Sequence, residues 1–401
     1  MRVSLGQARP RGSSDAEDGR NGAPRPLLIA SGARIVLGGE LGADGLAGEI
    51  VPGPATMFAP RGACLASPHG PLFVCDTGHH RLLIWRRTPG ADSTPADLLI
   101  GQPDFSREGR NAKGEIGPAT LNVPTGVAAA DGVLAVADAW NHRVLLWFGY
   151  PDVSNRPADV VLGQADFGGG WANRGAAAPS ASTLNWCYGV TFAAGCLLVA
   201  DTGNRRVLVW DHIPTTNGAP ADLVMGQPDF TTRDEDAGLP AGPLGMCWPH
   251  SVAVWRGAVF VADAGNNRVM AWKSMPGSNG SVCDFVLGQP DSAGVDHNRA
   301  AADPTDDAMS MPYGLAVQRD RLIVADTANS RILGFDRDAL MTGAKASRLA
   351  GQRAFTERGD NRWGRPVRDS VCWPYGVAAC DEMLLVADSG NSRVLLWDAA
   401  A

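Results

Sequence analysis

The sequence predicts an all-β protein folded as a six-bladed β-propeller, with four antiparallel strands in each blade. Three observations predict this fold. A phrase of the form Val-x-Asp-x-x-x-x-Arg occurs six times, with its aspartates 62 or 63 residues apart. Each repeat divides into short apolar runs separated by turn residues. The last repeat lacks one of these runs, and an unmatched run near the N-terminus can replace it.

The repeated phrase keeps a constant period along almost the whole chain. Its aspartates are Asp76, Asp138, Asp201, Asp263, Asp326 and Asp388. A second phrase, best represented by Gly-Gln-Pro-Asp-Phe, keeps step with the first, and its glutamines are Gln102, Gln164, Gln227, Gln289 and Gln352. Six regular units of this length indicate one repeat architecture rather than two or three ordinary domains.

The third repeat illustrates how one unit becomes a blade. Its apolar runs cover residues 189–192, 197–200, 206–210 and 222–226. Gly-, Asn- and Pro-containing turns separate them, and no helical spacing is sustained. Four short strands joined by such turns are typical of a propeller blade.

The two ends of the chain predict how the ring closes. The last repeat stops after three strands, at Trp397, whereas residues 33–39 resemble a fourth strand. Gly39 lies 63 residues before Gln102 and is therefore in phase with the series. We expect residues 33–39 to complete the blade of residues 371–398, which leaves one propeller over 26–398. Residues 1–25, rich in polar residues, Gly and Pro, are expected to be a disordered arm.

The phrase Val-Ala-Asp-x-x-Asn-x-Arg followed by an apolar strand resembles the NHL-repeat family, over roughly residues 30–398. The resemblance implies a six-bladed propeller. It also implies a range of functions, because NHL-type propellers include RNA-binding domains, protein-interaction platforms and a few lyases and hydrolases. The related amidating lyases use several histidines around a metal, but only His250 stands in the ring phrase described below.

Composition narrows the choice of partner. The formal net charge is -7, and the only lysines are Lys113, Lys273 and Lys345. Nucleic acids and anionic membranes are bound mainly by basic surfaces, so both are disfavoured as partners. No stretch reads as a signal peptide or membrane span, and we expect a cytoplasmic, monomeric protein with free thiols.

Residues that recur in every blade are interpreted as structural. Each repeated aspartate precedes a turn in which its carboxylate can accept backbone N–H groups, and the repeated arginine can pair with it. His79 replaces the usual Asn of this turn in the first repeat and is interpreted as a tolerated variant. An aromatic residue ends the third strand of each blade and is expected to fill the space between blades. These residues are Trp85, Trp147, Trp210, Trp272, Phe335 and Trp397.

Function is expected where the repeats differ, at the mouth of the central channel. Each first strand follows a phrase that usually ends in Pro-x-Gly. Its variable x residues are Arg61, Thr125, Tyr188, His250, Tyr313 and Tyr375. Two residues earlier stand Ala59, Val123, Trp186, Trp248, Met311 and Trp373, which share a side with the x residues if the chain is extended. Together they predict either an aromatic funnel for an aromatic, cationic or peptide-like ligand, or an aromatic plug.

Cysteines near the same mouth raise a metal hypothesis. Cys187, Cys247 and Cys372 with His250 could supply thiolate and imidazole ligands to a metal or cluster, although no Cys-x-x-Cys spacing supports it. We favour the alternative that these cysteines are small buried hydrophobic residues and that no cofactor is bound.

Three functions remain open at this point. We favour a binding or scaffold module that presents its aromatic mouth to a protein or peptide, without catalysis. The alternative is a lyase-like enzyme, or a metal- or cofactor-binding protein, with a site built from Cys, His and Tyr at the mouth, since Tyr and His can transfer protons. RNA binding is the third. The long links between repeats, such as 106–119 and 168–182, are expected to form a rim that grips a partner or to be solvated loops.

Overall fold

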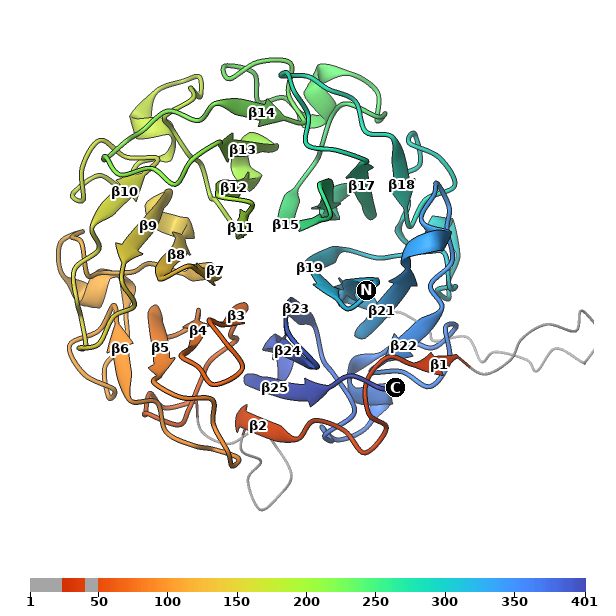
Figure 1. The fold of residues 1–401 in the computed structure, drawn as a ribbon, viewed down its shortest axis with the longest axis horizontal. Coiled ribbons are helices and arrows are strands. Elements are labelled where there is room, and N and C mark those ends of the chain that lie inside the picture. Colours follow the sequence, from red (N-terminus) through yellow and green to blue (C-terminus); the bar gives the residue numbers. More distant parts are fainter. Residues whose placement is uncertain (1–23, 40–49) are drawn as a thin grey trace, which may run out of the picture.

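Six β-sheets stand around a central axis in the computed structural model, which describes residues 24–39 and 50–401 (Figure 1). The predicted six-bladed, four-stranded antiparallel architecture is confirmed. The first 23 residues of the predicted arm lie outside the described part of the chain. Arg25 belongs to a short strand, β1 (Arg25–Pro26), which adds in parallel to the outer edge of one blade.

Each blade runs from an inner strand at the channel to an outer strand at the rim. Blade 1 contains β3 (Gly62–Leu65), β4 (Leu72–Asp76), β5 (Arg81–Trp85) and β6 (Leu98–Ile100). Blade 2 contains β7 (Pro124–Ala130), β8 (Val133–Asp138), β9 (Arg143–Phe148) and β10 (Val160–Leu162). Blade 3 contains β11 (Val190–Ala193), β12 (Cys196–Asp201), β13 (Arg206–Trp210) and β14 (Leu223–Met225).

The second half of the ring repeats this pattern. Blade 4 contains β15 (Pro249–Trp255), β16 (Ala258–Asp263), β17 (Arg268–Trp272) and β18 (Phe285–Leu287). Blade 5 contains β19 (Pro312–Gln318), β20 (Arg321–Asp326), β21 (Arg331–Asp336) and β22 (Arg348–Ala350), with β1 outside β22. Blade 6 contains β23 (Pro374–Cys380), β24 (Met383–Asp388) and β25 (Arg393–Asp398).

The N-terminal strand closes the ring as predicted. Strand β2 (Ile35–Gly38) pairs antiparallel with β25, with Val36 opposite Leu395 and Leu37 opposite Val394. It therefore supplies the fourth strand of blade 6 and covers the edge that β25 would otherwise expose. Figure 1 shows the red strand β2 beside the dark blue strands of blade 6.

Antiparallel pairing defines two faces of the ring. The turn between the second and third strands and the link from the fourth strand to the next blade emerge on the same side, which we call the top face. The other turns lie on the bottom face. Apolar side chains of adjacent blades pack between the sheets, and the aromatic residues that end the third strands are 0–3% exposed there. The interpretation of these aromatic residues as core is confirmed.

A buried ion pair anchors the top of every blade. The Asp carboxylate and the Arg guanidinium of the repeated phrase lie 2.6–2.9 Å apart in all six blades. In blade 3, Asp201 Oδ1 accepts the backbone N–H of Asn185, and Oδ2 accepts from Asn204 and Arg206. The guanidinium of Arg206 also donates to carbonyl groups of the links on both sides of the blade, such as Ser180 and Phe230. The pair thus fixes the turn, the start of the inner strand and the links together.

Internal hydrogen bonds hold the links in defined turns, although many of their side chains are exposed to solvent. In five of them an Asn or Asp takes a left-handed conformation, at Asn111, Asn173, Asp236, Asn298 and Asn361. This side chain accepts an N–H from the Asn of the adjacent turn, over 2.8–2.9 Å. The one or two residues that follow are also left-handed, so each of these links contains a short left-handed turn that begins at the Asn or Asp.

His79 replaces that turn Asn in blade 1 and makes two hydrogen bonds. Its Nδ1 lies 2.8 Å from Asp76 Oδ2, and its Nε2 lies 2.9 Å from the carbonyl oxygen of Ile50. Both neighbours are acceptors, so the geometry favours the doubly protonated ring. Burial lowers the pKa of His79, but the hydrogen bond and charge of Asp76 outweigh burial and hold the pKa above its ordinary value.

The ion pairs predict a large difference between buried and exposed charges. Arg206→Met leaves Asp201 buried without its partner, and we expect a loss of about 3–5 kcal/mol in the free energy of unfolding. Arg256→Met removes an ion pair to Asp320 whose side chains are more than half exposed, and the expected change is within about 0.5 kcal/mol. Urea unfolding of both variants measures the difference. Equal effects would show that the repeated pair contributes no more than a surface contact.

His79 predicts a pH dependence of stability. Because its pKa is raised on folding, its contribution is complete below the unfolded pKa of about 6.5 and is lost as pH rises through the folded pKa. We expect the free energy of unfolding of the wild type to fall relative to that of His79→Asn between pH 5.5 and 8.5. The variant carries the Asn that the other five blades have at this position. Its pH dependence of stability reflects all the other titrating groups and is subtracted from that of the wild type. A constant difference between the two proteins would contradict the prediction.

Candidate functional site

The six variable residues of the Pro-x-Gly phrase converge at the top of the channel. Tyr188, His250, Tyr313 and Tyr375 follow one another in ring contact, with centroids 4.3, 4.1 and 4.7 Å apart. The guanidinium of Arg61 lies 4.7 Å from the ring centre of Tyr375 and 5.6 Å from that of Tyr188. Arg61 thereby spans the small Thr125 and completes the circle. We call these six residues the mouth ring.

Glycines allow this convergence. In five blades the residue after x is Gly62, Gly126, Gly189, Gly314 or Gly376. A methyl group on any of them would lie 2.3–2.9 Å from the carbonyl oxygen of the x residue in the next blade. The phrase therefore keeps glycine because neighbouring inner strands touch there. The close approach brings the x side chains into mutual contact.

Blade 4 departs from this rule. It carries Ser251 in place of glycine, and the Ser251 hydroxyl accepts the N–H of Leu315 over 3.2 Å. Its mouth residue, His250, places Nδ1 2.9 Å from the carbonyl oxygen of Trp248. This contact assigns the proton of the neutral ring to Nδ1, because a carbonyl can only accept.

The mouth ring is closed rather than a funnel. Tyr188, His250 and Tyr313 are 6%, 3% and 8% exposed, so their faces pack on one another instead of offering surface to a ligand. Burial lowers the pKa of His250 to about 4 and raises the pKa of the Tyr188 and Tyr313 phenols. Near neutral pH these groups stay uncharged. A general acid or base works best with a pKa near the operating pH, so these three are poorly suited to proton transfer.

The chain is not extended two positions before x, although Trp186 still lies against the mouth ring, with ring centroids 6.0 Å from Tyr188 and 6.4 Å from His250. The expectation of an extended chain is wrong for Ala59, Val123, Trp186, Met311 and Trp373, whose φ angles are 47–55°. In each case a side chain of the preceding blade accepts the backbone N–H. The acceptors are His80, His142, Asn267, Ser330 and Ser392. At the junction before Trp248, the position of the acceptor is held by Arg205, whose side chain has no acceptor atom. Trp248 does not take the left-handed conformation.

The cysteine candidates have separate surroundings. Cys187 Sγ lies 3.2 Å from the carbonyl oxygen of Arg143, whereas Cys247 and Cys372 pack beside the turn glycines Gly265 and Gly390. Burial raises the pKa of Cys247 and Cys372 to about 12 and raises that of Cys187 well above its ordinary value, so the thiols stay protonated. In the part of the chain that the structure describes, no three His, Cys, Asp or Glu side chains gather as a metal-ligand set.

Five tryptophans outside the repeat pattern are exposed on the top face. Trp171 and Trp363, in two of the links, are 78% and 82% exposed. Trp140, in a turn, and Trp248 and Trp373, before inner strands, are 37–46% exposed. Sequence reasoning named the last two but missed Trp140, Trp171 and Trp363. The available signal was that these three fall outside the position where every other blade places its core aromatic residue.

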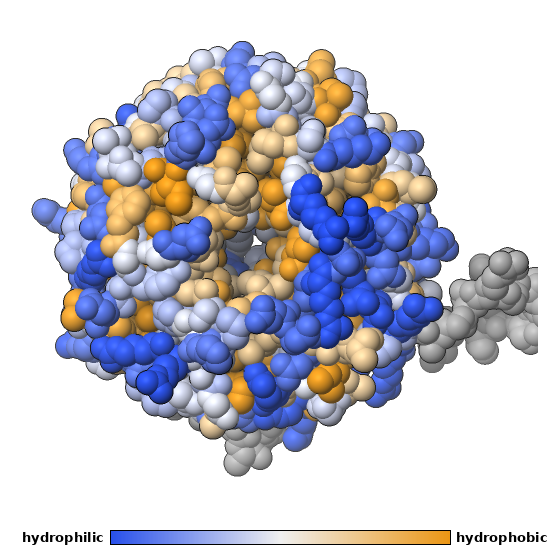
Figure 2. All heavy atoms as spheres, in the orientation of Figure 1, coloured by the Kyte–Doolittle hydropathy of each residue, from blue (hydrophilic) through white to orange (hydrophobic). Residues whose placement is uncertain are grey.

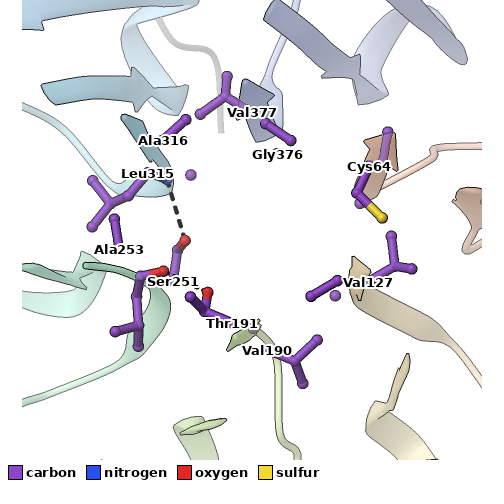
Figure 3. Close-up of a pocket in the computed structure, with 18 of the residues that line it drawn as sticks. Cys64, Val127, Val190, Thr191, Ser251, Ala253, Leu315, Ala316, Gly376 and Val377 are labelled. Atoms are coloured by element: carbon purple, nitrogen blue, oxygen red, sulfur yellow. Dashed lines mark hydrogen bonds between the residues drawn. The ribbon is translucent and has the colours of Figure 1, made fainter. Parts of the chain in front are cut away.

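A cavity of about 350 Å³ occupies the channel below the mouth ring. It is lined by the six inner strands, mainly through Val, Ala and Leu side chains. Figure 3 shows Val127 and Cys64 on one wall and Leu315 and Ala253 across from them. The central hollow is visible in the space-filling view of Figure 2.

Comparison with known proteins identifies two of the six repeats as NHL repeats. The NHL repeat pattern matches residues 121–145 and 246–270, which run from the start of the inner strand to the Asp-Arg phrase in blade 2 and in blade 4. The chain is a six-bladed propeller of NHL repeats. It is similar to NHL repeat-containing protein 2 of Gallus gallus, at 24% identity over 66% of this chain, and to that of Homo sapiens, at 23% over 82%.

This NHL-repeat propeller spans 44% of the length of either relative. Among solved structures, a protein of unknown function from Bacteroides thetaiotaomicron aligns over 88% of this chain and 73% of its own, at 11% identity and a TM-score of 0.49. That likeness is too distant to bear on function. Within residues 24–39 and 50–401, no helix has the length and hydrophobicity needed to cross a membrane.

The glycine contacts predict a steric effect on the mouth ring. Gly189→Ala places a methyl group 2.4 Å from the carbonyl oxygen of His250, and we expect a loss of about 1–3 kcal/mol in the free energy of unfolding. Gly277→Ala is the matched control, because nothing lies within 4 Å of the added methyl group. Chemical denaturation measures both. If the two variants are equally stable, inner-strand contact does not explain the glycine.

Proposed function

We propose that this NHL-repeat propeller is a binding module that presents its top face to a protein or peptide partner. The observation that carries the proposal is the set of exposed tryptophans there, at positions 140, 171, 248, 363 and 373. Tryptophan is enriched among the residues that dominate binding energy at protein interfaces, so five exposed tryptophans on one face favour a binding role.

The surrounding framework supports the same proposal. The links that carry Trp171 and Trp363 are held by hydrogen bonds to the turns and by the buried arginines. A rigid aromatic surface loses little conformational entropy on binding. Cation–π contact between Arg110 and Trp140, at 5.2 Å, further fixes one tryptophan.

The proposal places the contact surface around the mouth ring rather than in it. The ring side chains are mostly buried by one another, whereas the tryptophans of the links and turns stand outside them. The ring then serves as the floor of the surface. Trp248 and Trp373, which border the ring, belong to both the earlier prediction and this surface.

A pull-down experiment tests the role of the tryptophans. We expect the double substitution Trp171→Ser and Trp363→Ser to reduce partner recovery at least tenfold, because truncation of one interface tryptophan commonly costs about 2 kcal/mol or more. Both side chains are largely exposed, so the variant should keep the stability of the wild type. Quantitative mass spectrometry of the recovered proteins gives the ratio.

A far-face variant is the control. Val153→Ser and Val282→Ser alter exposed residues in the loops between third and fourth strands, on the bottom face. We expect this variant to recover the partner as the wild type does. Undiminished recovery by the tryptophan variant, or loss of recovery by the bottom-face variant, would refute binding through the top face.

A further inference from the structure

We propose that protonation of His142 releases Trp186 from the mouth ring and exposes it on the top face. At neutral pH, His142 holds the segment before the inner strand of blade 3 in its left-handed conformation. In mildly acidic solution this segment adopts the arrangement that blade 4 shows permanently. The junction between blades 2 and 3 works in this way whether or not the exposed tryptophans bind a partner.

The hydrogen bond to His142 requires an unprotonated nitrogen. Its Nδ1 accepts the backbone N–H of Trp186 over 2.8 Å, so the proton of the neutral ring lies on Nε2. In the doubly protonated ring, Nδ1 is a donor that points at another donor. At three other junctions the acceptor is Asn267, Ser330 or Ser392, whose side-chain oxygens accept at any pH. His142 therefore makes its junction sensitive to protons.

Trp186 depends on this acceptor for its conformation. Its φ angle is 50°, in the left-handed region, which is strained for a large side chain. The residue that follows is Cys187, whereas the other five blades have proline at this place. Proline restricts the backbone of the residue before it, and cysteine does not. Trp186 is therefore less constrained than its counterparts once its hydrogen bond is lost.

Blade 4 shows the conformation that accompanies the loss of the acceptor. There Arg205, a cation without an acceptor atom, takes the place of His142. The residue at the position of Trp186 is Trp248, which is not left-handed and is 40% exposed. The carbonyl of Trp248 accepts the N–H of Ala264, whereas in the other five blades the carbonyl of the preceding residue accepts from the turn. A released segment thus has a hydrogen-bonded arrangement available to it.

Release of Trp186 changes the mouth ring. Its indole ring meets Tyr188 and His250 edge-on, with centroids 6.0 and 6.4 Å apart. The indole Nε1 is buried and has no hydrogen-bond partner among the described residues. Exposure gives this donor a water partner, which offsets part of the cost of leaving the two rings. Movement of Trp186 uncovers the Tyr188 and His250 side of the mouth ring and adds a tryptophan to the top face.

The charges around His142 leave it free to titrate below neutral pH. Burial lowers the pKa of His142, so its proton is gained only below the ordinary value of about 6.5. On its own blade, the charges of Asp138 and Arg143 form a buried ion pair. On the side of the mouth ring, burial lowers the pKa of His250 to about 4 and raises that of Tyr188. A transition above pH 4.5 therefore belongs to neither of these ring residues.

Nuclear magnetic resonance of protein labelled with nitrogen-15 tryptophan tests the proposal between pH 7.5 and 4.5. The indole resonance of Trp186 is assigned by its absence in Trp186→Phe. In the wild type we expect it to shift with a midpoint below pH 6.5, together with the imidazole signals of His142. His142→Asn copies Asn267 and keeps the acceptor, so the resonance should stay at its neutral position. His142→Arg copies Arg205 and should hold the resonance at the acid position at every pH.

Three outcomes would overturn the proposal. A Trp186 resonance that does not shift in the wild type, or that shifts equally in His142→Asn, would show that His142 does not hold this segment. An unshifted resonance in His142→Arg would assign the conformation of blade 4 to Ser251 rather than to Arg205. Circular dichroism checks that the variants are folded, and the wild-type titration needs no variant. His80, which accepts the N–H of Val123 in the same way, is unchanged in every protein compared.

Discussion

The rest of this propeller depends on the buried Asp–Arg pair at the top of each blade. One carboxylate joins the end of the second strand to the N–H group before the inner strand, and one guanidinium joins the third strand to the links on both sides. A buried carboxylate and a buried guanidinium are tolerated only when all of their hydrogen bonds are made. The loops that supply these hydrogen bonds therefore have little freedom to move. The top face is rigid for this reason, although it consists of turns and links.

The contact between inner strands is the second constraint, and it turns a structural repeat into a site. In five blades, glycine at the strand start lets the backbone approach the carbonyl of the next blade closely, so the preceding side chains meet on the axis. The composition of the mouth ring is then free to differ from blade to blade without affecting the framework. Three tyrosines, a histidine, an arginine and a threonine occupy six equivalent places.

Much of the fold could be predicted because it depends on local, periodic signals. The blade count, the strands and the closure by residues 33–39 all follow from spacing, and the mouth ring follows from its place before the inner strand. The conformation two residues before the ring could not be predicted, because it depends on a side chain 43 or 44 residues earlier, in another blade. Neither could the burial that closes the ring, since that requires the distance between opposite strands.

Blade 4 shows how a departure in sequence becomes a departure in structure. Arg205 cannot accept the N–H that His142 accepts at the previous junction, and Ser251 has a side chain where the other blades have none. Trp248 is released from the left-handed conformation and is 40% exposed, and its carbonyl accepts the N–H groups of Ala264 and His250. Two departures from the repeat, Arg205 and Ser251, thus alter the same segment between the exposed tryptophans and the mouth ring.

The arginines of the repeated phrase and Arg61 have different roles, as a comparison between blades shows. Six of them are fully paired and buried, and the blades need them equally. Arg61 and Tyr188 are the two ring residues on either side of the small Thr125, and the Arg61 guanidinium reaches across Thr125 to the Tyr188 ring. The Arg61 guanidinium instead closes the ring itself, through cation–π contacts with Tyr375 and Tyr188, whereas the arginines of the repeated phrase each pair with a carboxylate.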